Sequence, residues 1–180
     1  MLTFVTGNKS KLKEASTLLG MKLAQNNLQL DEIQSLSVKE VSIAKAKAAH
    51  LKIDGPLIVE DTGLYINALN GFPGAFVKWF ELIGYDKICS MLATGDNSAY
   101  AETCVAFISG NVLEIFVGRV DGKISNAPRG KKGFGWDSIF EPKGYEKTMA
   151  ELSDSEKNKV SMRGQAFLKL KDYLSSNGYY

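Results

Sequence analysis

The sequence predicts an α/β fold with a mixed, twisted sheet and flanking helices, and three observations support this prediction. Apolar runs at 2–6 and 57–59 each adjoin a stretch with helical spacing, which is typical of strand–helix units. Residues 99–124 instead alternate with a period of two, which predicts antiparallel strands. With 180 residues, 44% of them hydrophobic, the chain can bury one core, and we expect a single domain over 1–180.

The N-terminal unit is a buried strand at 2–6 followed by a helix. Gly7 and Asn8 end the strand, and the Asn8 side chain can cap the helix that follows. Gly20 is placed to stop that helix in a left-handed conformation. A short extended stretch at 28–30 comes next.

A second helix is expected over 38–52, because Ser37 and Glu40 form a capping-box pattern before apolar residues at helical spacing. The apolar strand that follows runs directly into Glu60 and Asp61. Two carboxylates are therefore expected at the end of a buried strand.

The C-terminal half is predicted to contain short helices, a meander and a last helix. Helical stretches at 78–83 and 86–93 precede the period-two segment, in which the turn pairs at 110–111 and 121–122 predict an antiparallel meander. A helix over 161–174 is expected to bury Phe167 and Leu168 among others.

Charge and cysteine content argue against several classes of protein. With 22 basic and 20 acidic residues, the net charge of +2 gives no broad field for a general nucleic-acid or membrane-surface binder. Two cysteines and one histidine cannot build a disulfide framework or a structural zinc site. The histidine, His50, lies within an expected helix, which argues against a Ser-His-Asp triad. No apolar run reaches the roughly 20 residues of a membrane span, and no leader pattern precedes the first strand. We therefore expect a cytoplasmic protein.

The loop at 6–11 is a candidate phosphate site. It lies between a strand and a helix, where backbone N–H groups, the helix dipole and two lysines favour an anion. It matches neither a Walker A loop nor Gly-x-Gly-x-x-Gly. A capped surface helix with solvated lysines is the alternative.

The acidic pair Glu60 and Asp61 is a candidate metal site. Two carboxylates near the interior are costly unless a cation neutralises them. Oxygen ligands suit Mg²⁺, which takes one or two carboxylates and completes its shell with water and substrate phosphates. The alternative is a solvated acidic turn, and it applies more strongly to Asp31 and Glu32.

The glycine-rich stretch 129–137 carries three cations and two aromatic rings, and we expect a loop. Phe134 and Trp136 beside Asp137 suit stacking on a base and accepting hydrogen bonds from its edge. The alternative is an aromatic plug in the core.

Motifs spread along nearly the whole chain resemble those of a known family. They are Thr6-Gly-Asn-x-x-Lys11, Val59-Glu-Asp-Thr62 with Gly71-x-Pro-Gly74, Lys78-Trp-Phe80, Phe134-Gly-Trp-Asp137 and Glu156-Lys-Asn-x-x-Ser-x-Arg163. In this order they resemble the inosine triphosphate pyrophosphatase family. The resemblance implies two lobes around a central nucleotide cleft and a homodimer. It also implies Mg²⁺-dependent hydrolysis of ITP, dITP and XTP to the monophosphate and pyrophosphate, with Mn²⁺ as a substitute metal.

The same resemblance implies roles for individual positions. Lys11 and Asp61 would be catalytic, with Asp61 orienting or deprotonating the attacking water, and Glu32, Glu60 and Asp61 would form the metal site. Substrate would be held by Thr6, Gly7, Asn8, Lys9, Ser10, Lys11, Lys45, Thr62, Lys78, Phe134, Gly135, Trp136, Asp137, Lys157, Met162 and Arg163.

Two departures from the family pattern affect these roles. Lys9 and Ser10 differ from the usual loop residues, so one phosphate contact is expected to be made differently. The family's Ser-His-Arg is Ser161-Met162-Arg163 here, and a thioether cannot donate the hydrogen bond that a histidine could. We expect weakened base selectivity, with Arg163 left as a charged donor to a 6-oxo group.

Two other functions stay open at this point. One is a related pyrophosphatase that acts on modified pyrimidine or methylated nucleotides. The other is a module that binds single-stranded nucleic acid through Lys131, Lys132 and the nearby rings. The acidic pair at Glu60 and Asp61 would repel a nucleic-acid backbone, which weighs against the second.

Overall fold

The computed structural model describes residues 1–133 and 135–179, and within them one mixed sheet has seven strands in the order β2-β1-β3-β5-β6-β7, with β4 paired to β3. The strands are β1 (Thr3–Val5), β2 (Ala24–Asn26), β3 (Leu57–Ile66), β4 (Pro73–Gly74), β5 (Ser98–Ser109), β6 (Val112–Ile124) and β7 (Phe140–Pro142). β1 runs parallel to β2 and β3, and the other pairs are antiparallel. The predicted mixed α/β sheet is confirmed.

Helices flank this sheet on both faces. They are α1 (Lys9–Leu19), α2 (Val38–His50), α3 (Val77–Phe80), α4 (Tyr85–Leu92), α5 (Asp154–Val160) and α6 (Met162–Ser176). Short 3₁₀ turns are η1 (Asn67–Leu69), η2 (Glu81–Ile83), η3 (Gly135–Ser138) and η4 (Met149–Glu151). Within the described ranges, every helix is too short or too polar to cross a lipid bilayer.

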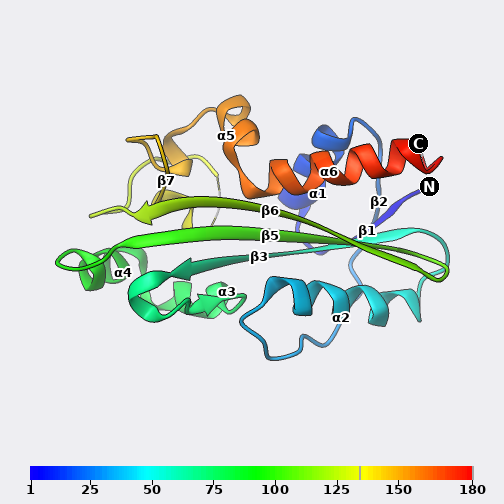
Figure 1. Ribbon diagram of the computed structural model, residues 1–180, viewed down its shortest axis with the longest axis horizontal. Coiled ribbons are helices and arrows are strands. Elements are labelled where there is room, and N and C mark those ends of the chain that lie inside the picture. Colours follow the sequence, from blue (N-terminus) through cyan, green and yellow to red (C-terminus); the bar gives the residue numbers. More distant parts are fainter. Residues whose placement is uncertain (134, 180) are drawn as a thin grey trace.

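The molecule has two lobes joined by its long strands. Figure 1 shows β3, β5 and β6 running along the molecule, with α2 on one face and α1 and α6 on the other. We call β1, β2, α1, α2 and the C-terminal part of α6 the first lobe. At the end far from both termini, α3 and α4 lie on the α2 side while α5 and β7 lie on the α6 side (Figure 1), and these elements form the second lobe.

Apolar packing accounts for the layers. Under α1 and α6, the rings of Phe4 and Phe167 meet edge to face with centroids 6.1 Å apart. On the opposite face, the small side chains Ala46 and Ala49 let α2 lie close against the sheet. The sheet is covered on both faces here, which explains why its central strands read as continuous apolar runs. A separate cluster that includes Trp136 fills the second lobe.

The predicted helix caps are largely confirmed. The Asn8 side chain accepts hydrogen bonds from two backbone N–H groups of the first turn of α1, at 2.9 and 3.1 Å. Gly20 ends that helix with φ +71°. Ser37 caps α2 by accepting from Glu40, but the Glu40 carboxylate bonds to the Ser35 hydroxyl, so only half of the predicted capping box forms.

Four local predictions are wrong. The strand predicted at 57–59 continues to Ile66, because β3 pairs with β5 along its whole length, so Glu60 and Asp61 lie inside a strand and not at its end. The segment at 28–30 is not a strand; β2 ends at Asn26. In each case the pairing of whole strands decided the bounds, and local composition did not.

The other two errors are at 121–122 and in the last helix. Asp121 and Gly122 form no turn, because β6 is held there between β5 and β7. Phe167 is buried in α6 as expected, but Leu168 is half exposed, since it lies on the outward side of the helix.

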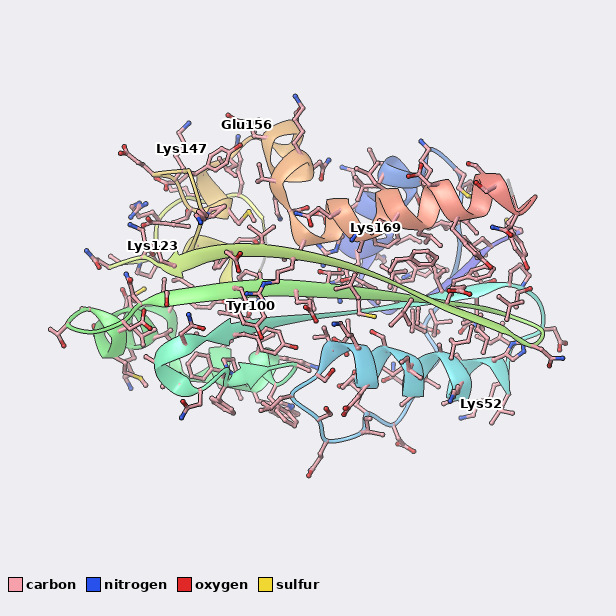
Figure 2. All side chains as sticks on the ribbon, viewed as in Figure 1. Lys52, Tyr100, Lys123, Lys147, Glu156 and Lys169 are labelled. Carbon is pink, nitrogen blue, oxygen red and sulfur yellow. The ribbon has the colours of Figure 1, made fainter. Side chains whose placement is uncertain are left out.

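Several exposed lysines lie far apart on the molecule. Figure 2 shows Lys52, Lys123, Lys147 and Lys169 spread over different elements on both sides of the sheet. Lys169 bonds to the Val117 carbonyl oxygen at 2.7 Å. These four lysines do not form a continuous basic track of the kind that follows a nucleic-acid backbone.

Gly118 fixes how closely α6 approaches the sheet. A Cβ at this position of β6 would collide with the carbonyl oxygen of Met162, at the start of α6. We expect Gly118→Ala to destabilise the protein by about 1–3 kcal/mol, the usual cost of overpacking. Urea unfolding measures this, with Gly95→Ala as the control because a Cβ there meets nothing within 4 Å. Equal stabilities for the two variants would contradict the prediction.

Candidate active site

A cavity of about 430 Å³ opens where the two lobes meet. It brings together the start of α1, the middle of β3, α3, η3 and the start of α6. The sequence-predicted residues that line it are Thr6, Gly7, Asn8, Lys11, Glu32, Lys45, Glu60, Asp61, Thr62, Lys78, Trp136, Asp137, Lys157, Met162 and Arg163. Of the remaining predictions, Lys9, Ser10 and Gly135 lie outside the lining, and Phe134 lies outside the described residues.

The topology of β3 explains why the cavity forms there. β1 pairs with Leu57 and Ile58, and β4 pairs with Leu64 and Tyr65. Between these partners, residues 60–62 pair with β5 on one side, and no described strand pairs with their other edge. The gap leaves one backbone edge of β3 open at these residues.

Alternation along β3 sends its two acids in opposite directions. Successive side chains of a strand point to opposite faces of the sheet. Glu60 accordingly meets Arg163 of α6, whereas Asp61 meets Lys45 of α2. The cavity therefore receives charged groups from helices on both faces.

Glu60 is buried and held by cations. Its two oxygens accept from Arg163 at 3.1 Å each, and Lys11 lies 3.4 Å away. Thr62 donates a further hydrogen bond at 2.7 Å. Burial alone would raise the pKa of Glu60, but Arg163 and Lys11 lower it to about 2. This carboxylate stays ionised and anchors the two cations, so it is a poorer metal ligand than the sequence suggested.

Asp61 is less well compensated. One oxygen accepts the backbone N–H of Thr62 at 3.0 Å, and the other lies 3.7 Å from the Lys45 amine. Burial raises the pKa of Asp61 despite the lysines nearby. Lys45 also binds Glu32 at 2.7 Å, which brings that loop carboxylate to the same place. Asp61 and Glu32 thus share a single cation.

The metal expectation can be tested against this arrangement. Across residues 1–133 and 135–179, no three acidic, histidine or cysteine side chains gather closely enough to hold a metal alone. The site fits a cation that takes one or two carboxylates and shares the phosphates of a ligand, as Mg²⁺ commonly does. Asp61, whose pKa is raised by burial, would be the first ligand of such a cation, with Glu32 second.

The start of α1 offers a ligand the charge of a lysine side chain, because the first backbone N–H groups of the helix are already bonded. The Asn8 side chain already accepts the N–H groups of Ser10 and Lys11. An anion in the cavity would therefore meet the Lys11 side chain, and Lys45 and Lys78 also line the cavity. Among the described residues, no carboxylate lies within 4 Å of the Lys78 amine, so its charge remains for a ligand.

The other end of the cavity is aromatic and acidic. Trp136 packs edge to face on Phe140, with centroids 5.6 Å apart, and its ring helps to line the cavity. Asp137 is buried and bonded to Lys157 of α5 at 2.7 Å. Met162 belongs to the same apolar cluster as Trp136 and is buried. The lining thus offers an aromatic ring for a planar ligand group and lysines for a polyanion.

Arg163 is buried, and its guanidinium is bound to carboxylates of the protein. Its guanidinium bonds to Glu60 and, at 2.5 Å, to Glu14 of α1. Glu14 also lies 3.7 Å from Lys157, so it connects the two cations. No local pattern indicates a role for Glu14, because a lone acid on a helix is most often solvated. A direct contact from Arg163 to a base stays a prediction.

Sequence reasoning also missed lining residues outside the motifs. They are Val5, Leu28, Gln29, Leu30, Ala75, Val77 and Glu81, and Ser161, a motif residue given no role, also lines the cavity. Most are apolar or small, and nothing in their local pattern separates them from ordinary core or loop positions. Among these residues, Glu81 brings a carboxyl group to the cavity.

Comparisons with known proteins agree with this geometry. The family model described as the Ham1 family matches residues 2–173. The chain is 40% identical to a dITP/XTP pyrophosphatase of Thermococcus kodakarensis, over 98% of each chain, and 44% identical to an inosine triphosphate pyrophosphatase of Yarrowia lipolytica, over 97% of this chain and 95% of that protein.

Solved structures show the same fold. The Ham1 protein of Staphylococcus aureus superposes with a TM-score of 0.86 at 25% identity, covering 98% of each chain. A HAM1 protein from Coxiella burnetii gives 0.85 at 30% identity, covering 97% of this chain and 98% of that one. With the family model, the sequence relatives and the fold in agreement, the chain belongs to the Ham1 family.

Proposed function

We propose that this chain is a nucleoside triphosphate pyrophosphatase that hydrolyses the deaminated purine nucleotides ITP, dITP and XTP, as one domain spanning 1–180. The observation that carries the proposal is one cavity whose lining combines Lys11, Lys45 and Lys78 with the ring of Trp136 and the acid Asp61. The names of the relatives, inosine triphosphate pyrophosphatase and dITP/XTP pyrophosphatase, support the substrate class.

The charges of the cavity suit attack on a triphosphate. A triphosphate carries about four negative charges, which repel hydroxide until cations neutralise them. Lys11, Lys45 and Lys78 supply part of that charge, and Mg²⁺, or Mn²⁺ in its place, would supply the rest when bound by Asp61 and Glu32. Glu60 keeps Lys11 and Arg163 in position.

Asp61 is placed to act on water. A carboxylate whose pKa is raised by burial is a better proton acceptor than a solvated one. In the proposed reaction Asp61 orients a water and takes its proton as the oxygen attacks the α-phosphorus, and pyrophosphate leaves with nucleoside monophosphate as the other product. The lysines stabilise the charge that develops on the leaving group.

The base would lie at the Trp136 end, where stacking gives affinity without selectivity. Selectivity requires groups that distinguish a 6-oxo from a 6-amino purine. Met162 offers no hydrogen to donate, so position 162 does not contribute the donor that the family pattern usually has. Asp137, Lys157 and Arg163 are the remaining polar groups of the predicted set near this end.

Product analysis tests the proposed function. The protein is incubated with Mg²⁺ and ITP, XTP, dITP, dUTP or ATP, and pyrophosphate and orthophosphate are measured separately. We expect pyrophosphate from ITP and XTP at a higher kcat/KM than from ATP. Orthophosphate as the product would contradict the proposal, and a preference for dUTP would support the pyrimidine alternative instead.

A homodimer is part of the proposal. Trp79, Leu82 and Met91, from the α3 to α4 region, are 66%, 78% and 56% exposed, an unusual concentration of large apolar side chains on one segment. Sedimentation is expected to give a species of twice 19.7 kDa. A purely monomeric species at micromolar concentration would remove this claim.

We also propose a cytoplasmic location. Cys89 and Cys104 are both free and buried, as suits a reducing compartment.

Asp61→Asn tests the role given to the carboxylate. The substitution keeps the shape of the side chain but removes the charge that would hold the metal and accept the proton. We expect kcat on ITP to fall by at least about 10²-fold, as for loss of a general base. Asp54→Asn, an exposed acid outside the cavity, is the control and should keep wild-type turnover. Near-normal turnover of Asp61→Asn at saturating Mg²⁺ would show that the assignment is wrong.

A further inference from the structure

Glu81 differs from the other carboxylates that line the cavity. Glu32 and Asp61 share Lys45, Glu60 is bound by Arg163, and Asp137 is bound by Lys157. For Glu81, in contrast, no basic group of the described residues lies within 4 Å. It enters the cavity from η2, three residues after Lys78 of α3.

Neutral donors lie beside the Glu81 carboxylate. The backbone N–H of Trp136 and the Tyr85 hydroxyl both lower its pKa, although burial raises the pKa overall. Burial and the nearby Glu81 raise the pKa of Tyr85 to about 12, so the hydroxyl remains a donor at neutral pH. A Cβ at Gly135 would lie 2.9 Å from Glu81 Oε1, so the carboxylate packs directly against the turn that carries Trp136.

This arrangement leaves acceptor capacity in the cavity. An ionised carboxylate has about four acceptor positions, and the two protein donors use two of them. A half-buried charge without a cation is unfavourable unless something donates to it. Burial accordingly raises the pKa of Glu81. A ligand with an N–H group at the Trp136 end would satisfy the carboxylate.

The 6-oxopurines offer such a group. Hypoxanthine and xanthine carry a hydrogen on ring nitrogen N1, next to the 6-oxo group, whereas adenine has a lone pair on N1. A fixed carboxylate attracts the first and repels the second. Asp137 is less suited to this task, because Lys157 already neutralises it at 2.7 Å.

We propose that Glu81 is a specificity-determining residue, whose carboxylate accepts a hydrogen bond from the N1–H of a 6-oxopurine and disfavours a 6-aminopurine. The inference rests on the proposed function and extends it to a residue outside the motifs that predicted the site. It places the acceptor on η2, directly after the helix whose Lys78 faces the phosphates, so one short segment contacts both ends of the substrate.

Glu81→Gln tests the proposal, because the carboxamide has the same shape but carries a donor in place of one acceptor. We expect kcat/KM for ITP to fall by roughly 10- to 100-fold, the range for a hydrogen bond to a charged group, while kcat/KM for ATP holds or rises. The ratio of ITP to ATP is the readout. Glu114→Gln, an exposed acid on β6 outside the cavity, is the matched control and should leave the ratio unchanged.

A substrate analogue gives a second, independent measurement. In 1-methyl-ITP the N1 hydrogen is replaced by a methyl group, so the wild-type protein should use it at least about tenfold less well than ITP, and Glu81→Gln should show a much smaller difference. The comparison of ITP with 1-methyl-ITP on the wild-type protein tests the role of the N1 hydrogen even if Glu81→Gln does not fold.

The outcomes are distinguishable. If Glu81 merely holds the turn of Trp136, Glu81→Gln lowers ITP and ATP turnover in parallel, and the unchanged ratio overturns the inference. Equal use of ITP and 1-methyl-ITP by the wild type overturns it as well. In both cases ITP turnover by the wild type keeps the proposed function intact. A wild type that releases no pyrophosphate from ITP overturns the proposed function and the inference together.

Discussion

The buried ion pair between Glu60 and Arg163 is the interaction on which the site depends. It joins β3 to α6 across 103 positions of sequence, with two bonds of 3.1 Å, and Glu14 and Lys11 attach α1 to the same pair. Such a pair is weak evidence for net stability, because desolvation offsets much of the attraction, but losing one partner leaves an uncompensated buried charge that costs about 3–5 kcal/mol. The pair therefore fixes where the three elements meet, and the cavity is the space they leave.

The open edge of β3 turns this constraint into a binding site. Where residues 60–62 have no strand on one side, polar side chains can exist at the centre of an otherwise apolar sheet. Alternation then divides the two acids: Glu60 becomes structural because Arg163 saturates it, and Asp61 becomes chemically available because Lys45 must also serve Glu32. Adjacent residues of the same charge thus acquire different roles from the direction in which they point.

Much of this could be predicted from sequence where the signal is local. A few neighbouring residues determine the cap at Asn8, the end of α1 at Gly20 and the start of α2. Each is present as predicted, apart from half of the Ser37 capping box. The predicted ends of the strands were wrong because strand pairing depends on two segments. Pairing with β5 extends β3 past Glu60 and Asp61, and pairing with β7 keeps β6 extended at 121–122, where a turn was predicted. The motif residues converged on one cavity, but the partners of Arg163 and the place of Glu81 depend on contacts between distant segments, which no local pattern records.

The hydrogen-bond donors and acceptors that line the cavity limit how the protein could distinguish one base from another. Three of the five donors of the Arg163 guanidinium are bonded to Glu60 and Glu14, and Met162 brings no donor to the position beside it. Lys157 is drawn toward Asp137 and Glu14. These cationic groups are thus largely committed to protein acids, whereas no basic group of the described residues lies within 4 Å of the Glu81 carboxylate. Under these conditions discrimination falls more naturally to a protein acceptor that meets a ring N–H than to a donor that meets the 6-oxo oxygen. A site that lacks the usual histidine can keep its selectivity in this way, because rejecting a lone pair placed against a fixed carboxylate needs no additional donor.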